Sequence, residues 1–159
     1  MFDKVARRRY AGGMYEEQAL AYFHRGFNCA QSVFAPFAEP LGLSEEQALR
    51  LASGFGAGIG RMRLTCGAFS GLTLVAGHCQ GNLSGNPEEK ERIFALVRQQ
   101  AELFTQEFGT LCCRELLHLD EHTTEGARPS ERTQAYYEAR PCERCVAFCA
   151  RAAAALLKP

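Results

Sequence analysis

Residues 54–71 read GFGAGIGRMRLTCGAFSG, a stretch in which six glycines surround a single cysteine, Cys66. The glycine-rich half predicts a tight turn with positive φ angles, where the backbone can approach a neighbouring segment closely. Thr65 is a suitable N-cap, so we expect a helix to begin there with Cys66 in its first turn. Free amide groups and the positive end of the helix dipole would favour the thiolate form of that cysteine.

The same glycines also occur in nucleotide-binding loops, which offers a second interpretation. Such a loop needs a strand before it and a phosphate-binding helix after it. The segment before Gly54 has a helical pattern, and no Gly-Lys-Ser or Gly-Lys-Thr follows. We therefore expect a structural turn rather than a phosphate site.

The segment 65–81 predicts a central, buried helix, because it is almost continuously apolar. Gly67 and Gly71 are four residues apart, and so are Gly77 and Gly81. Residues at this spacing share a helix face, so both pairs predict the close approach of another helix.

Helical periodicity and capping signals extend over most of the chain. Asn28 is a preferred N-cap, and Ser44 precedes Gln47 at the capping-box spacing. Asn86 and Pro87 begin the clearest helix. The predicted helical segments are residues 16–26, 28–39, 44–54, 65–81, 86–109, 112–119 and 142–157, with a polar loop over 120–133.

No segment shows the period-two pattern of a strand, and no repeat of roughly 20 to 50 residues is present. No linker rich in proline or serine divides the chain. The prediction is one all-α domain over residues 1–159, a bundle of five to seven helices with a glycine-rich loop before the central buried helix.

Charge and hydropathy narrow the function classes. Eighteen basic and eighteen acidic side chains cancel, which argues against nucleic-acid binding driven by bulk charge. No apolar run approaches the roughly 20 residues of a membrane-spanning helix, and no signal peptide is recognisable at the start. We expect a cytoplasmic location, where structural disulfides are rare.

Eight cysteines in such a chain require an explanation. Any one of them could be a small buried hydrophobic residue, but they are grouped rather than scattered. They stand as the single residues Cys29, Cys66 and Cys79, the pair Cys112 and Cys113, and the cluster Cys142, Cys145 and Cys149.

Two features beside these cysteines bear on thiol reactivity. Cys29 directly follows the predicted N-cap Asn28, so it also belongs near a helix N-terminus. Arg61 and Arg63 precede Cys66, and a positive charge near a thiol lowers its pKa. The alternative is that both arginines lie at the surface.

The last cluster suits two kinds of chemistry. Cys142, Cys145 and Cys149 share one helix face, and Cys-x-x-Cys is the spacing of dithiol redox motifs and of metal ligands. A fourth ligand from Cys112 or Cys113 would complete a zinc or iron–sulfur site. The alternative for Cys149 is packing in the core. The c-type haem motif is absent, because no histidine follows Cys145.

Residues 66–71, CGAFSG, with Cys29 before them and Cys113 after them, resemble the hallmark of the C_GCAxxG_C_C family of redox-active proteins. The resemblance extends from residue 27 to the last helix, and it implies a helical domain with four hallmark cysteines and a redox role. The fourth hallmark cysteine is either Cys142 or Cys145. The further cysteines in this chain depart from the four-cysteine plan.

The leading hypothesis is a thiol–disulfide redox protein, with thiol–disulfide oxidoreductase as the corresponding enzyme class. Cys66 is the predicted activated thiolate and Cys29 its resolving partner, with Cys113 and either Cys142 or Cys145 as a second pair. A thioredoxin-like reductant or another electron donor would reset it. The resemblance also suggests a membrane transporter system as a partner, because family members tend to sit near transporter genes. Glycine-rich helices are compatible with a homodimer.

Two other hypotheses stay open. In one, Cys29, Cys66, Cys113, Cys142 and Cys145 hold zinc or an iron–sulfur cluster in an electron-transfer module. In the other, the chain is an interaction protein whose cysteines are structural.

Overall fold

The computed structural model describes residues 4–157, with side chains from residue 12 onwards. Within this range the chain forms α-helices, one 3₁₀ helix and no strand, which confirms the all-α class. The helices are α1 (Lys4–His24), α2 (Cys29–Phe34), η1 (Ala35–Phe37), α3 (Glu45–Ser53), α4 (Gly67–Gln80), α5 (Pro87–Phe108), α6 (Cys113–Leu116), α7 (Gln134–Glu138) and α8 (Cys142–Leu156).

The predicted number of five to seven helices is wrong, because the described residues contain eight α-helices. The helix that the sequence analysis did not predict is α7, whose five residues are too few to show a helical period in the sequence. Thr133 caps it, since its hydroxyl accepts a hydrogen bond from the Tyr136 amide at 3.1 Å.

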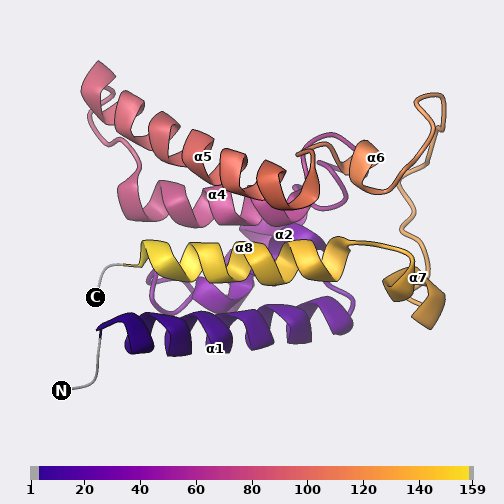
Figure 1. The fold of residues 1–159 in the computed structure, drawn as a ribbon, viewed down its shortest axis with the longest axis horizontal. Helices are drawn as coiled ribbons and strands as arrows, with labels where there is room; N and C mark the ends of the chain where they lie inside the picture. Colours follow the sequence, from indigo (N-terminus) through magenta and orange to yellow (C-terminus); the bar gives the residue numbers. More distant parts are fainter. Residues whose placement is uncertain (1–3, 158–159) are drawn as a thin grey trace.

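Helix α8 lies between α1 and α4, and α5 covers the far side of α4 (Figure 1). Helices α4 and α8 both begin at the end of the bundle where α6 and α7 lie, and α1 ends there (Figure 1). A contact between the His24 imidazole and the Glu143 carboxylate joins the end of α1 to the start of α8. Several helix N-termini therefore meet at one end of the molecule.

The close approach predicted for Gly67 and Gly71 is confirmed, and the neighbour is α2. A Cβ atom on Gly71 would lie 2.9 Å from the Ala30 carbonyl oxygen and 2.9 Å from Val33 Cβ. A Cβ atom on Gly67 would lie 3.3 Å from the Ala30 amide nitrogen of α2, and 3.1 Å from the Phe55 carbonyl oxygen in the turn before α4. Helix α2 can therefore pack on α4 only because these two positions lack a side chain.

The same prediction for Gly77 and Gly81 is wrong. In the part of the chain that the structure describes, no neighbouring atom lies within 4 Å of a Cβ built on Gly77, and the nearest neighbours of Gly81 belong to Gly77 itself. This end of α4 is open to solvent, so its glycines serve no helix packing.

The N-caps predicted at Asn28, Ser44 and Asn86 are all confirmed. Asn28 and Ser44 each form a complete capping box, with Gln31 and Gln47 respectively. In both boxes two amide groups at the helix start are satisfied by side chains, which defines where the helix begins.

The N-cap predicted at Thr65 is wrong, because α4 begins at Gly67 and Cys66 is its N-cap. The reason is tertiary. Thr65 forms a β-bridge with Cys112, and the Cys66 amide donates to the Leu111 carbonyl at 2.8 Å. These contacts hold the backbone extended through Cys66, so the first helical residue comes later.

The turn before α4 has the positive φ angles that its glycines predict, including 73° at Gly58. The left-handed conformation also extends to residues with side chains, namely Ala57, Ile59, Arg61 and Arg63. Asn28 holds this turn against α2. The Asn28 side chain occupies the space that a Cβ on Gly56 would need, and its side-chain amide donates to the Ser53 carbonyl at 2.9 Å.

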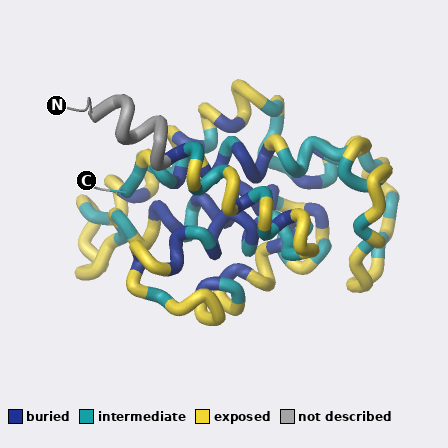
Figure 2. The backbone as a smooth tube through the Cα atoms, turned by 90° about the horizontal axis from the view of Figure 1, so that it is seen from below, coloured by how far each residue is buried: buried dark blue, intermediate teal, exposed yellow. Residues whose placement is uncertain are grey.

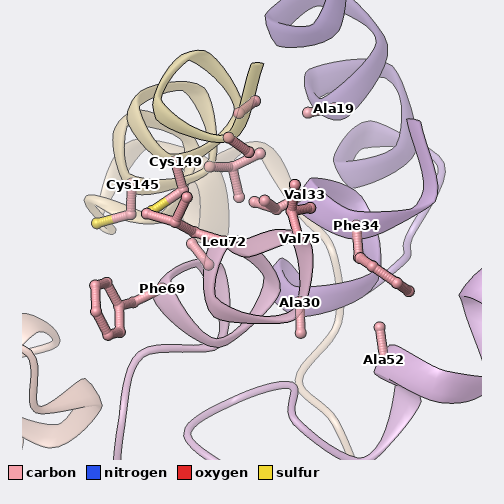
Figure 3. Close-up of a cluster of buried hydrophobic side chains, with 14 of the residues drawn as sticks. Ala19, Ala30, Val33, Phe34, Ala52, Phe69, Leu72, Val75, Cys145 and Cys149 are labelled. Carbon is pink, nitrogen blue, oxygen red and sulfur yellow. The ribbon is translucent and has the colours of Figure 1, made fainter. Parts of the chain in front are cut away.

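Buried residues run along the middle of the molecule, and exposed residues surround them (Figure 2). In the core, Leu72 and Val75 of α4 lie between Val33 of α2 and Cys149 of α8 (Figure 3). The sequence prediction of a central, buried α4 is therefore confirmed. None of the helices in the described range combines the length and apolar character needed to cross a bilayer.

Replacing Gly71 with alanine should destabilise the protein by about 1–3 kcal/mol, because the added methyl group overlaps the α2 backbone. Gly77→Ala on the same helix is the matched control. It should stabilise the protein by about 0.5–1 kcal/mol, because nothing occupies the space and alanine favours a helix. Denaturant unfolding followed by circular dichroism measures both. Equal effects of the two substitutions would contradict the packing argument.

Candidate functional site

A cavity of about 90 Å³ lies at the end of the bundle where the helix N-termini meet. All five cysteines predicted as site residues line it, namely Cys29, Cys66, Cys113, Cys142 and Cys145. Four of them stand at helix starts: three are the first residues of α2, α6 and α8, and Cys66 is the N-cap of α4. These four cysteines thus converge through helix starts rather than through a shared loop.

Backbone pairing between two distant segments sets the positions of Cys66 and Cys113. The Cys66 amide bonds to the Leu111 carbonyl, and the Cys113 amide donates to the Leu64 carbonyl at 2.6 Å. The Arg114 amide continues the pairing to the Arg63 carbonyl at 3.1 Å. The start of α6 is therefore held beside the start of α4.

Cys66 and Cys145 form a hydrogen-bonded thiol pair. The Cys145 thiol donates to Cys66 and lowers its pKa, and the amides of Ala68 and Phe69 lower it further. The same hydrogen bond and burial raise the pKa of Cys145. Both side chains are buried, with Cys66 6% and Cys145 1% exposed. The helix N-terminus therefore favours a thiolate on Cys66, although Cys66 caps the helix instead of lying within it.

Cys29 and Cys142 form the second hydrogen-bonded pair, and both are half-buried. The Cys29 thiol donates to Cys142, which lowers the pKa of Cys142 to about 7 despite partial burial. The positive charges of Arg140, Arg132 and Arg63 act in the same direction. The pKa of Cys29 is raised well above its ordinary value by the same hydrogen bond and by burial.

Cys113 lines the cavity as a protonated thiol. Burial raises its pKa to about 11, although the nearby Arg63 guanidinium opposes this shift. The Arg63 Nη1 atom lies 3.9 Å from Cys113 Sγ. Of the cavity cysteines, Cys66 and Cys142 are therefore the two whose pKa is lowered.

Arg61 and Arg63 are tied to a single acid, Glu125, in the loop before α7. Arg63 donates through Nε and Nη2 to the two Glu125 carboxylate oxygens, and Arg61 Nη2 reaches Oε1 at 3.1 Å. Arg63 is only 4% exposed, so the surface interpretation is wrong for it. Its charge acts on Cys113 and Cys142, whereas the sequence prediction directed it towards Cys66.

Arg132, Tyr136 and Arg140 complete the cavity wall, and the sequence analysis did not select them. Both guanidinium groups pack on the Tyr136 ring, with Arg140 at 4.1 Å and Arg132 at 4.8 Å from its centroid. The position of Arg140 two residues before Cys142 was a usable signal, because the same argument applied to Arg61 and Arg63.

A family model described as "Putative redox-active protein (C_GCAxxG_C_C)" matches residues 27–157.

The chain belongs to this family.

Comparison with curated proteins and with solved structures found no match. The matched range of the C_GCAxxG_C_C model spans every cysteine of the cavity and all helices from α2 to α8. The structure explains the residues of the CGAxxG segment in this chain. Cys66 lines the cavity, and Gly67 and Gly71 lie against α2.

The remaining three cysteines of this family member lie outside the cavity wall. Cys149 is fully buried in the core, as its packing alternative predicted. Cys112 caps α6 and its sulfur lies 3.7 Å from the Arg63 carbonyl oxygen. Cys79 is half-buried towards the far end of α4. The candidate fourth hallmark positions, Cys142 and Cys145, both line the cavity.

The predicted pairing of Cys66 with Cys29 differs from the hydrogen bonds in the structure, which join Cys66 to Cys145 and Cys29 to Cys142. All five cavity cysteines are thiols rather than disulfides. Among the residues described, no three side chains of His, Cys, Asp or Glu are arranged to hold one metal ion.

The rate of Cys142 alkylation by iodoacetamide should rise with pH and reach half its maximum near pH 7, because only the thiolate reacts. Peptide mapping by mass spectrometry reads each cysteine separately. Cys113 is the internal control, with its half-maximum near pH 11. Cys29→Ala should move the Cys142 midpoint upwards, because the hydrogen-bond donor is lost. An unchanged midpoint in Cys29→Ala would refute the assigned hydrogen bond.

Replacing Glu125 with glutamine should destabilise the protein by about 1–3 kcal/mol, because the buried Arg63 charge loses its counter-ion. Glu131→Gln removes the same charge from an exposed position of the same loop and should leave stability almost unchanged. Thermal and denaturant unfolding of the two variants test this difference, and a similar stability for both would show that Glu125 does not hold the loop.

Proposed function

We propose that this protein is a thiol–disulfide redox protein that reduces a disulfide in the cysteine cavity. One observation carries the proposal: five thiols from separate parts of the chain line a single cavity. The lowered pKa of Cys66 and of Cys142 supports it. A nucleophile beside a second thiol is the arrangement that dithiol exchange requires. Membership in a redox family supports the same chemistry.

Cys142 is the proposed attacking thiolate. It is half-buried, whereas Cys66 is almost fully enclosed, and its pKa of about 7 gives a substantial thiolate fraction at neutral pH. Its sulfur attacks one sulfur of the substrate disulfide. A new S–S bond forms to Cys142, the substrate S–S bond breaks, and the departing substrate sulfur leaves with the electron pair as a thiolate.

Cys29 then resolves the mixed disulfide. Its thiol proton passes to the departing thiolate, and its sulfur attacks Cys142 Sγ. The internal Cys29–Cys142 disulfide forms while the second substrate thiolate leaves, so two protein thiols are oxidised and one substrate disulfide is reduced. This assigns Cys29 the resolving role predicted from the sequence, but with Cys142 as its partner.

Cys66 and Cys145 form the inner pair of the proposal. The Cys66 thiolate can attack the Cys29–Cys142 disulfide, and Cys145 can then close a Cys66–Cys145 disulfide, which returns the outer pair to thiols. A thioredoxin-like dithiol would reset the protein by the reverse exchange. We assign Cys113 no step, because it is held protonated.

Mixing the reduced protein with bis(2-hydroxyethyl) disulfide tests the proposal. Peptide mapping should find Cys29–Cys142 and Cys66–Cys145 disulfides in the wild type. In Cys29→Ser, a mixed disulfide should accumulate on Cys142, because the resolving thiol is absent. Cys112→Ser is the matched control and should give the wild-type bridges, because Cys112 lies outside the cavity.

Two results would reject the proposal. One is a mixed disulfide distributed over the half-buried cysteines, inside and outside the cavity, with no preference for Cys142. The other is protein isolated with zinc, or with iron and inorganic sulfide, that is lost in Cys142→Ser. The second result would support the metal-binding alternative instead.

A further inference from the structure

The cavity that holds the thiols is strongly basic. Four arginines line it together with the five cysteines, and none of the described aspartates and glutamates belongs to its wall. These arginines are Arg61, Arg63, Arg132 and Arg140. The chain as a whole has no net charge, so this concentration of one sign is local rather than a general property of the surface.

A single nearby carboxylate, Glu125, compensates these four positive charges only in part. Glu125, which lies behind the wall, accepts hydrogen bonds from Arg61 and Arg63. Among the described residues no carboxylate lies within ion-pair distance of Arg132 or Arg140, each of which forms other contacts. The cavity therefore keeps a net positive charge on the side where Cys142 begins α8.

Arg132 and Arg140, which form no ion pair with a described carboxylate, are both held in place. Arg132 donates to the carbonyl oxygens of Phe23 at 3.1 Å and Phe27 at 2.9 Å, and its guanidinium packs on the Phe23 and Tyr136 rings. Arg140 packs on the Tyr136 ring. Guanidinium groups fixed on an aromatic ring cannot turn freely into solvent, so their charge stays directed at the cavity.

We propose that the cavity selects a negatively charged substrate, a small disulfide that carries a carboxylate or another anionic group close to its sulfur atoms, and that Arg140 and Arg132 bind that group. This inference rests on the proposed function, because it names the class of disulfide that the thiols reduce. A compact anionic group is required, since the cavity measures only about 90 Å³.

The arginines would also assist the exchange itself. When the Cys142 thiolate attacks, one S–S bond forms, the substrate S–S bond breaks, and negative charge develops on the departing sulfur. Fixed guanidinium groups beside that sulfur stabilise the charge without rearrangement. Arg140 and Arg132 are therefore proposed as binding residues for the anionic group, while Cys142 and Cys29 exchange the bonds.

Three small disulfides of different charge provide the test: anionic 2,2′-dithiodiacetate, neutral bis(2-hydroxyethyl) disulfide and cationic cystamine. The measured quantity is the ratio of the second-order rate constants for oxidation of Cys142 by the anionic and the neutral compound. Each ratio is divided by the same ratio for free 2-mercaptoethanol, which removes the intrinsic reactivity of the probes. The wild type should prefer the anion about tenfold and should react slowest with cystamine.

Substitution of Arg140 tests the assigned residue. Arg140→Gln should lower the ratio several-fold, and Arg140→Lys should restore most of it. Because both probes react with the same thiolate, the ratio is independent of any change in the pKa of Cys142. Arg144→Gln is the matched control: it removes a charge from an exposed position outside the cavity and should leave the ratio unchanged.

A measurement on the wild type alone guards against variants that fail to fold. Raising the salt concentration to about 1 M should reduce the anionic preference, because the attraction is between charges. A corrected ratio near one in the wild type, with normal oxidation by the neutral probe, overturns this inference and leaves the proposed function intact. Failure of all three probes to oxidise the cavity thiols overturns the proposed function, and this inference with it.

Discussion

The packing of α2 on α4 is the constraint on which the site depends. Two positions without side chains, Gly67 and Gly71, let the backbones of these helices meet, and the starts of both helices then face the same space. Cys29 and Cys66 enter the cavity for that reason. A side chain at either glycine would push α2 away from α4 and separate the sulfur atoms along with it. The family hallmark CGAxxG thus contains one cysteine that lines the cavity, Cys66, and two glycines that allow the helices to pack, Gly67 and Gly71.

Electrostatics divides the converging thiols into different roles. Burial disfavours every thiolate, so a thiol in the cavity stays protonated unless donors or positive charges compensate. Cys66 has amide donors from its own helix, and Cys142 has nearby arginines, whereas Cys113 has too little compensation for its burial. Cys66 and Cys142, whose pKa values are lowered, each accept a hydrogen bond from a neighbouring thiol, and the pKa of that neighbour rises. The two thiols of each pair therefore differ in pKa because only one of them has amide donors or arginines beside it.

The loop between α6 and α7 contributes more than its polar composition suggests. It reads as an ordinary solvated connection, yet it supplies Glu125 to a buried arginine and leads into the segment that carries Arg132 and Tyr136. Long-range contacts of this kind have no periodicity and no fixed spacing, so a pattern in the sequence does not reveal them. The same applies to the pairing of residues 63–66 with 111–114, which delays the start of α4 past the predicted cap.

By itself the sequence determined the features that depend on neighbouring residues. These are the helical class, the caps at Asn28, Ser44 and Asn86, the left-handed turn, the close packing at Gly67 and Gly71, and the set of cysteines that carries the family resemblance. Only the tertiary structure decided which thiols pair, which thiol faces which arginine, and how the cavity acquired its charge. The physical reason is that pKa values and hydrogen bonds depend on distances across the bundle, between residues as far apart as Cys29 and Cys142, and local propensity carries no information about them.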